Sequence, residues 1–157
     1  MATLTINQKK GQFGNNPYGN MTALIFDVQA DNSGFIVNTN HKEVPKAGDI
    51  IHVGELPEGF IPFGYRTLVE KEFTAGAFDV GFSYVDGVDD ENHPQKDTGL
   101  FTLPTLTTKG GATAGELKVK ALPKSAYLDL KVTTPTAKGN KAGHLTIIVF
   151  GMLLGHA

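Results

Sequence analysis

The sequence contains no cysteine and no tryptophan among its 157 residues. Without cysteine the chain has no disulfide, no thiolate nucleophile and no cysteine-ligated zinc, so a small disulfide-stapled scaffold is excluded. Without tryptophan it lacks a side chain that is frequent among interface anchors. Disulfide bonds are not needed for stability, because a chain of this length buries roughly 70% of the surface that its unfolded form exposes. The length fits one domain.

An excess of charge of one sign is also missing. The formal net charge is -2, which predicts neither nucleic acid nor an anionic membrane as a partner. The longest apolar run, residues 145–154, is roughly ten residues long and contains Gly151, whereas a membrane helix needs about 20. The N-terminus lacks the basic start and apolar run of a signal peptide. We therefore expect no membrane span and no export by the general secretory route.

The spacings of common catalytic sites do not occur either. Ser83 lies in Gly-Phe-Ser-Tyr, which is not the Gly-x-Ser-x-Gly elbow of a serine hydrolase. The histidines lack the close spacings of zinc sites, so a zinc site would need histidines that are distant in sequence. No glycine-rich phosphate-binding motif follows a strand pattern. We expect a protein that is not an enzyme.

What the sequence does contain is a series of short strand patterns. From Phe78 to Tyr84, apolar side chains alternate with small or polar ones, which is typical of a half-buried strand. Residues 145–150 hardly alternate, which predicts a central strand covered on both faces. Strands are expected at residues 23–29, 34–38, 50–53, 64–73, 77–85, 100–103, 116–121, 126–133 and 145–154. These segments predict an all-β fold, an antiparallel β-sandwich or a jelly-roll-like domain.

The first 20 residues differ in composition from the rest. Residues 11–20 are rich in glycine and asparagine, with Phe13 and Tyr18 as the only large side chains. Such a segment cannot form a core of its own. Two interpretations stay open: a flexible terminus, or an extended arm whose Phe13 and Tyr18 dock on a neighbouring subunit. We divide the chain into an N-terminal arm at residues 1–20 and a single β-sandwich domain at residues 21–157.

Carboxylates are crowded into one long loop, residues 86–97. Asp86, Asp89, Asp90, Glu91 and Asn92 supply the oxygen ligands that calcium prefers, although their spacing does not match an EF-hand. A solvated acidic loop is the other interpretation. General acid–base work by Asp89 and Glu91 needs a sugar-binding cleft, which nothing in the sequence indicates. Calcium is the one cofactor that the sequence suggests.

Charge is segregated along the chain. Acidic residues are frequent between Glu70 and Asp97, whereas lysines crowd the last third. Patches of opposite sign attract copies of the same chain, head to tail or around a ring. We therefore expect an interface that includes Phe13, Tyr18, Lys118, Lys120, Lys138 and Lys141.

The order of residues between 47 and 85 carries a resemblance. Ala-Gly-Asp at 47–49 precedes a short apolar strand, and Leu-Pro-Glu-Gly at 56–59 has proline and glycine where a type I turn favours them. A long strand follows, and then Phe-Asp-Val-Gly-Phe at 78–82. This pattern, which extends over roughly residues 44–153, resembles small virion structural proteins of tailed bacteriophages, of the capsid decoration or cement type.

The resemblance implies a virion protein that binds the lattice of the major capsid protein and assembles with itself, as a trimer. It implies a place on the capsid exterior, and in the host cytoplasm during assembly. The long acidic loop and the arm depart from the pattern, so the face that meets the capsid is left open. A head-fibre base, a minor capsid role or a tail component are other virion roles. A carbohydrate- or ligand-binding β-sandwich module is the alternative outside virions.

Overall fold

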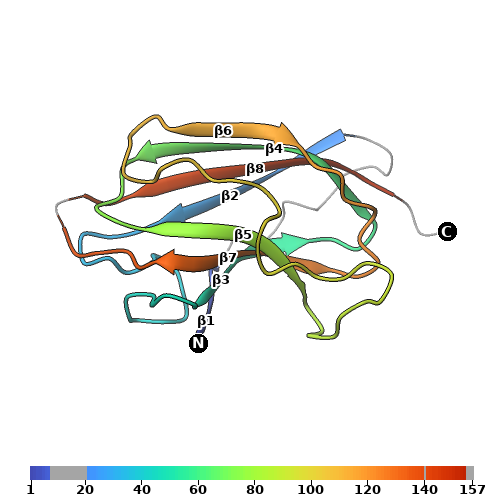
Figure 1. The fold of residues 1–157 in the computed structure, drawn as a ribbon, viewed down its shortest axis with the longest axis horizontal. Coiled ribbons are helices and arrows are strands. Elements are labelled where there is room, and N and C mark those ends of the chain that lie inside the picture. The colour runs from blue at the N-terminus through green and yellow to red at the C-terminus, as the bar shows by residue number, and fades with distance from the viewer. Residues whose placement is uncertain (8–20, 140, 155–157) are drawn as a thin grey trace.

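The computed structural model describes residues 1–7, 21–139 and 141–154, which form two β-sheets packed face to face (Figure 1). One sheet has the strand order β1-β3-β7-β5 and the other β2-β8-β4-β6. All paired strands are antiparallel except β1 and β3, which are parallel. The strands are β1 (Thr3–Thr5), β2 (Met21–Gln29), β3 (Ile50–Leu56), β4 (Phe60–Lys71), β5 (Ala77–Tyr84), β6 (Ala112–Glu116), β7 (Ala126–Thr134) and β8 (His144–Leu153). The predicted all-β fold class is confirmed.

Successive strands alternate between the two sheets, so each connection crosses from one layer to the other. With β2 taken as the first strand, this order is that of a jelly roll, in which two Greek keys wrap around one core. Residues 96–100 run along the free edge of β5, where a jelly roll has one more strand. There the Phe82 N–H donates to the Lys96 carbonyl at 2.5 Å, and the Leu100 N–H donates to the Val80 carbonyl at 2.8 Å.

The core lies between the inner faces of the two sheets. Alternate residues of β8, Leu145, Ile147 and Val149, are buried there, and Leu128 and Leu130 of β7 are buried in the opposing sheet. This alternation follows from the period-2 geometry of strands, since every second side chain points inward. The apolar residues of the strand patterns therefore become one core.

The predicted turn at residues 56–59 joins β3 to β4 and leads from one sheet to the other. The Phe60 N–H donates to the Pro57 carbonyl at 3.2 Å. Gly59 has a φ of 77°, which a residue with a side chain adopts only with strain. A Cβ at Gly59 would also come within 2.9 Å of the Leu154 carbonyl oxygen. Glycine is therefore required at this crossing.

Three expected strands are wrong. Residues 34–38 form turns, because Asp31 Oδ1 accepts the N–H groups of Ser33 and Phe35 at 2.8 and 3.0 Å and so bends the chain. Residues 100–103 lack a strand, although Leu100 bonds to the edge of β5. The strand expected at 116–121 lies earlier, as β6, whose Thr113 pairs with Thr67 of β4. The described residues contain no helix that could span a membrane.

The start of the chain contributes a strand that the sequence analysis did not expect. β1 pairs with β3 through Leu4, which faces Ile51, and both side chains are fully buried. Asp49 ties this strand down, since its two carboxylate oxygens accept the N–H groups of Ala2 at 2.7 Å and Lys46 at 2.8 Å. Residues 8–20, and with them Phe13 and Tyr18, lie outside the described residues.

The expectation that β8 is covered on both faces is wrong for its outer face. β8 is central in its sheet, between β2 and β4. Its inner residues are buried, but Thr146, Ile148 and Phe150 on the outer face are only half-buried. The outer apolar side chains of β8 therefore belong to the molecular surface and not to the core.

Candidate functional site

The acidic loop, defined as residues 86–97, is folded around its own carboxylates. Asp89 Oδ1 accepts the N–H groups of Asp90 and Gln95, both at 2.8 Å. Asp90 Oδ1 accepts those of Asn92 and His93, both at 2.9 Å. In the part of the chain that the structure describes, no group of three or more histidine and carboxylate side chains is placed to hold a metal ion. The calcium site stays a prediction.

Lys124 fastens the beginning of the acidic loop to the sandwich. Its Nζ donates to Asp86 Oδ2 and to the Val88 carbonyl, both at 2.9 Å, and lies 5.0 Å from the centre of the Tyr84 ring. The N–H of Val88, together with Lys124, lowers the pKa of Asp86. Burial, together with the charges of Asp90, Asp89 and Asp86, raises the pKa of Tyr84. The Tyr84 hydroxyl stays protonated at neutral pH and donates to the His93 carbonyl at 2.7 Å.

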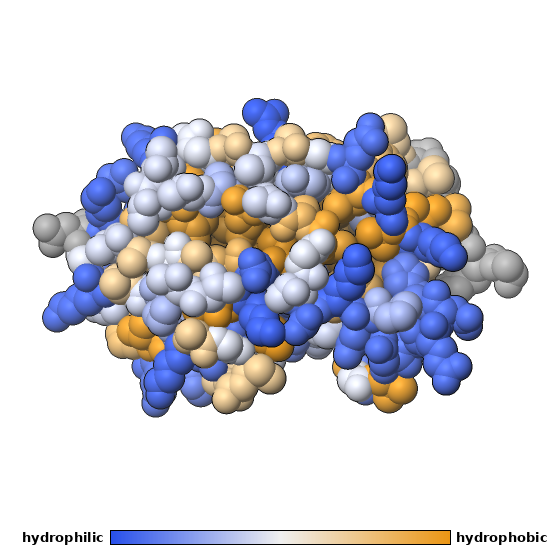
Figure 2. All heavy atoms as spheres, in the orientation of Figure 1, coloured by the Kyte–Doolittle hydropathy of each residue, from blue (hydrophilic) through white to orange (hydrophobic). Residues whose placement is uncertain are grey.

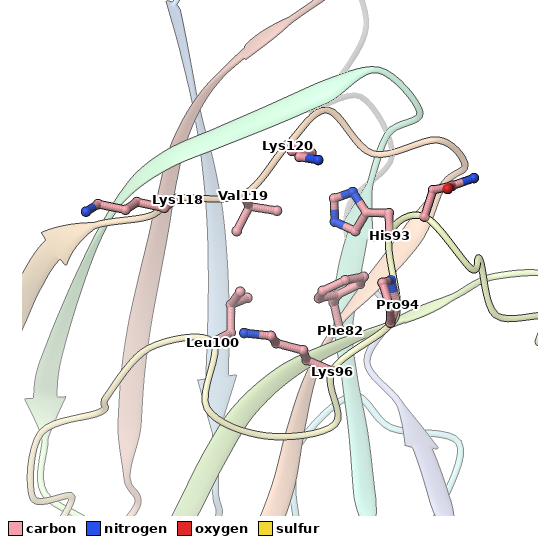
Figure 3. Close-up of a pocket in the computed structure, with 9 residues that line it drawn as sticks. Phe82, His93, Pro94, Lys96, Leu100, Lys118, Val119 and Lys120 are labelled. Carbon is pink, nitrogen blue, oxygen red and sulfur yellow. The ribbon is translucent and has the colours of Figure 1, made fainter.

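Beyond the loop, the chain forms a shallow pocket of about 200 Å³ between β5 and the segment that follows β6. We call it the lysine pocket (Figure 3). Phe82, Leu100 and Val119 give it an apolar floor, and the His93 ring stands edge-on to the Phe82 ring at 5.7 Å. Asn92, Pro94, Lys96, Lys118 and Lys120 complete the lining.

The lysine pocket brings together two of the predicted interface lysines. Lys118 and Lys120 lie on one side of it and Lys96 on the other (Figure 3). Lys96 was missed because it lies within the acidic loop in sequence, among carboxylates. Lys138 and Lys141 lie elsewhere, and Lys141 Nζ pairs with Glu72 Oε1 at 2.7 Å. The lysine cluster is therefore smaller than the sequence suggested and lies beside the acidic loop.

The space-filling view shows this neighbourhood from the open edge of the sandwich. Hydrophilic side chains gather over the acidic loop at the lower right, beside a hydrophobic stretch that runs between the two sheets (Figure 2). The hydrophilic side chains at this end of the molecule thus border an apolar strip.

A second surface, which we call the apolar face, covers the outer side of the sheet β2-β8-β4-β6. Strand register places Ile25 beside Ile148, and Met21 beside Met152. The side chains of Met21 and Ile25 are 73% and 49% exposed. The apolar face comprises Met21, Ala23, Ile25, Ile61, Ile148, Phe150 and Met152, and the exposed Arg66 of β4, which pairs with Ile148, lies at its border. The apolar residues of β8 that the sequence shows could have indicated this face, but the sequence analysis assigned them to the core.

The outer side of the other sheet is polar by contrast. Asp129 of β7 is only 2% exposed, and its two carboxylate oxygens bond to His52 Nδ1 and Ser83 Oγ, both at 2.5 Å. The His52 ring also stacks on Tyr127 at 4.3 Å. A serine nucleophile needs the imidazole itself beside its hydroxyl. Here the carboxylate lies between the two, so the arrangement satisfies a buried charge and does not activate Ser83.

Comparisons with known proteins bear on the fold. No family model and no curated protein sequence matches the chain. A chain in the solved structure of the cyanophage Pam1 capsid asymmetric unit has 13% identity and a TM-score of 0.47, with coverage of 92% of this chain and 94% of that one. A chain in the solved capsid of Ralstonia phage GP4 has 21% identity and a TM-score of 0.60, covering 99% of this chain and 100% of that one. The sandwich described above is therefore a fold that also occurs, end to end, in a chain of that phage capsid.

Proposed function

We propose that the protein is a structural component of a tailed-phage virion that decorates or cements the capsid by binding the lattice of the major capsid protein from outside. The likeness in fold to a chain of the Ralstonia phage GP4 capsid supports this role. The observation that carries the proposal is the apolar face. Among the described residues, the apolar face is the surface best suited to bind a protein partner.

The apolar face has the properties of an interface and not of an ordinary surface. Large contiguous apolar patches are rare on soluble monomers and mark sites of association. Here the patch is flat and rigid, because the three strands β2, β8 and β4 hold it in register. Full burial of one large aliphatic side chain is worth about 1.5–3 kcal/mol. Covering Met21, Ile25 and Ile148 together would thus contribute a large share of a binding energy.

Polar groups close one end of the apolar face. His144 Nε2 lies 2.9 Å from Asp27 Oδ1, and His144 Nδ1 lies 3.2 Å from Glu70 Oε2. Thr146 Oγ1 lies 3.0 Å from Asp27 Oδ1 and 2.9 Å from Glu70 Oε1, so its single O–H donates to one or the other carboxylate. A polar border around an apolar centre is the usual anatomy of a protein–protein interface.

The proposed protein is a homo-oligomer, a trimer, in which residues 8–20 reach a neighbouring subunit through Phe13 and Tyr18. A closed ring suits a site on a capsid, since each subunit then presents the same surface to an equivalent capsid subunit. A stable interface buries about 800 Å² on each partner. Each of the two interfaces, that of the apolar face with the capsid and that of residues 8–20 with the neighbour, would have to approach that area.

The test uses particles from which the gene for this chain has been deleted. Such particles are incubated with purified protein, pelleted, and analysed for bound protein and by cryo-EM. Ile25→Lys places a charge on the apolar face, beside Ile148 of the central strand β8, and occupancy should fall at least about tenfold, the factor that 1.4 kcal/mol of lost binding gives. Val85→Lys is the matched control, because Val85 is a similarly exposed aliphatic residue, at 41%, just after β5 of the other sheet.

Two results would overturn the proposal. Mass spectrometry of purified virions that detects no copy of the chain removes the virion role altogether. Equal occupancy by the Ile25→Lys and Val85→Lys proteins removes the apolar face as the binding surface. Circular dichroism of both variants must match the unmodified protein, so that a folding defect is not read as lost binding.

A carbohydrate- or ligand-binding module is the second candidate. Such modules present several aromatic rings to the sugar, but of the phenylalanines near the turn Phe60 is buried in the core and Phe63 alone is exposed, at 36%. The Tyr65 ring is stacked on Phe101 at 4.3 Å. These contacts favour the virion role, and a glycan array with saturable binding to one sugar class would favour the module instead.

A further inference from the structure

We propose that the tip of the acidic loop of one copy docks into the lysine pocket of a second copy. Val88 enters the apolar floor of the pocket, and the carboxylates of Asp89 and Glu91 pair with the lysines around it. This contact between copies does not depend on the virion role, because it is a property of the purified chain.

The pocket has a chemistry that defines its occupant. Its floor of Phe82, Leu100 and Val119 favours a small apolar side chain. At its border Lys96, Lys118 and Lys120 are exposed, and none of the three forms an ion pair with a described residue. An apolar group flanked by carboxylates therefore complements the pocket in both respects.

The acidic loop carries such a group at its tip. Val88 is 60% exposed, although it is aliphatic, and Asp89 and Glu91 beside it are exposed as well. The hydrogen bonds within the loop use Oδ1 of Asp89 and Oδ1 of Asp90. The second oxygen of each carboxylate is left to face a lysine ammonium group.

The loop is also held in one conformation before it binds. Lys124 donates to the Val88 carbonyl and to Asp86, and the Tyr84 hydroxyl holds the far side of the loop at His93. A preformed loop loses little conformational entropy on docking, which strengthens binding for a given contact area. In the same chain Val88 stays exposed, so the loop does not fill the pocket of its own copy.

A second copy fits the pocket better than nucleic acid does. A long polyanion on Lys118 and Lys120 would continue over Asp89, Asp90 and Glu91, which lie in the loop that forms one wall of the pocket. Repulsion from these carboxylates limits the occupant to a short acidic segment. The chain carries such a segment itself, with an apolar side chain at its tip.

The contact is expected to be weak in solution and stronger when copies are held side by side. A pocket of about 200 Å³ takes one side chain. One side chain buries much less area than the roughly 800 Å² that each partner buries in a stable interface. Tethering of neighbours to one scaffold raises their effective concentration into the millimolar range. The exposed charge pairs make the contact sensitive to salt.

The absence of cysteine makes disulfide trapping a clean test, since an engineered cysteine can bond only to another engineered one. Two single variants, Val88→Cys and Val119→Cys, carry different affinity tags and are mixed at low salt under mild oxidant. Val88→Cys mixed with Lys138→Cys is the matched control, because Lys138 is exposed and lies outside the pocket. The Val88–Val119 heterodimer should form at least about tenfold faster than the control pair, as 1.4 kcal/mol of contact free energy predicts.

Two further experiments distinguish docking from random collision of the two proteins. Adding Lys118→Glu and Lys120→Glu to the Val119→Cys protein should bring its rate down to that of the control. Reversing Glu91 to lysine in the Val88→Cys partner should then restore part of the fast rate, because opposite charges face each other again while Asp89, whose Oδ1 holds the loop backbone, is unchanged. At about 1 M salt, where the Debye length is about 3 Å, the preference of the unreversed pair should disappear.

The proposal is overturned if the heterodimer forms no faster than the control pair, or if charge reversal on both sides restores none of the lost rate. It is also overturned if a single-stranded oligonucleotide binds the unmodified protein and loses binding on Lys118→Glu/Lys120→Glu, because the pocket would then take nucleic acid. A capsid-binding defect of Ile25→Lys has no bearing on these readouts. The two proposals can therefore fail separately.

Discussion

Ser83 Oγ donates a hydrogen bond to Asp129 Oδ2 at 2.5 Å, across the neighbouring strands β5 and β7. The other carboxylate oxygen bonds to His52 of β3, so one buried aspartate joins three strands of a sheet. Burying a charge is costly unless it is paired and hydrogen-bonded. This network therefore lies on the polar outer side of one sheet, whereas the outer side of the other sheet carries the apolar face with polar groups at its border.

We expect Asp129→Ala to destabilise the protein by about 1–3 kcal/mol, because the Ser83 hydroxyl and the His52 imidazole lose their partner in a buried position. Asp79→Ala is the matched control, since Asp79 is an exposed carboxylate on β5 and its loss should cost no more than about 0.5 kcal/mol. Urea denaturation gives both free energies of unfolding. Equal losses in the two variants would show that the network contributes nothing.

The stability of the β1 attachment should depend on pH through Asp49. The N–H groups of Ala2 and Lys46 lower the pKa of this carboxyl, with the hydrogen bond from Ala2 as the largest cause. Because the folded-state pKa lies below that of the unfolded chain, the stabilisation is present above about pH 4. It is lost as the pH falls through the folded-state value.

We expect Asp49→Asn to destabilise the protein at neutral pH by about 1–3 kcal/mol, since an amide offers one acceptor oxygen where two N–H groups need one each. The difference from the unmodified protein should shrink as the pH is lowered toward about 2. Urea denaturation at several pH values measures it. A difference that stays constant over this range would contradict the assignment.

The start of the chain and residues 8–20 should behave differently when removed. Deleting residues 1–7 removes the buried Leu4 and Ile6, and should lower the free energy of unfolding by about 1.5–3 kcal/mol for each. Replacing residues 8–20 by a Gly-Ser linker of equal length keeps β1 and should leave the melting temperature nearly unchanged. If the arm docks on a neighbour, light scattering will show a lower oligomeric mass for the linker variant. An unchanged mass would show that Phe13 and Tyr18 do not hold copies together.

Gly81 of β5 should not tolerate a side chain. A Cβ at this position would overlap the backbone of Lys96 and Asp97, which run along the edge of the strand. We expect Gly81→Ala to displace this segment and to cost about 1–3 kcal/mol, as overpacking usually does. Gly64→Ala is the control, since its Cβ would meet no atom closer than 3.5 Å. Hydrogen exchange at Phe82 and Leu100 should be faster in the Gly81 variant alone.

Lys124→Met should loosen the acidic loop while keeping the apolar part of the side chain. It removes the ammonium group from Asp86 and from the Val88 carbonyl, with little effect on the free energy of unfolding because the ion pair is exposed. The Val88 N–H, which bonds to Asp86 Oδ1, should exchange faster with solvent. Lys138→Met is the matched control. Unchanged exchange at Val88 would show that Lys124 does not order the loop.

The positions of most strands follow from the sequence alone. The alternation from Phe78 to Tyr84 predicts β5, and the burial pattern of that strand agrees with it. Proline and glycine at 56–59 predict the turn before β4. These features are local, since the direction of a side chain in a strand is set by its position in the alternation. The same local information predicted the all-β class.

Other features depend on residues that are distant in sequence, and only the tertiary structure decided them. β1 is three residues long, which is too short to show an alternating pattern. It forms because its backbone pairs with β3, where Leu4 is the register partner of Ile51. Residues 145–150 read as buried on both faces, because apolar character does not reveal which side of a sheet another layer will cover. The sequence pattern therefore led us to assign the β8 residues of the apolar face to the core.

The candidate sites divide in the same way. The acidic loop is one stretch of sequence, so its carboxylates were evident, but their hydrogen bonds to the loop backbone depend on its folded shape. Lys118 and Lys120 were expected at an interface, but their neighbour Lys96 was not. Lys96 reaches the pocket because residues 96–100 pair with the edge of β5. Composition and period-2 patterning thus determined what kind of fold this is, whereas long-range strand pairing decided which side chains meet, because it alone sets which distant segments become neighbours.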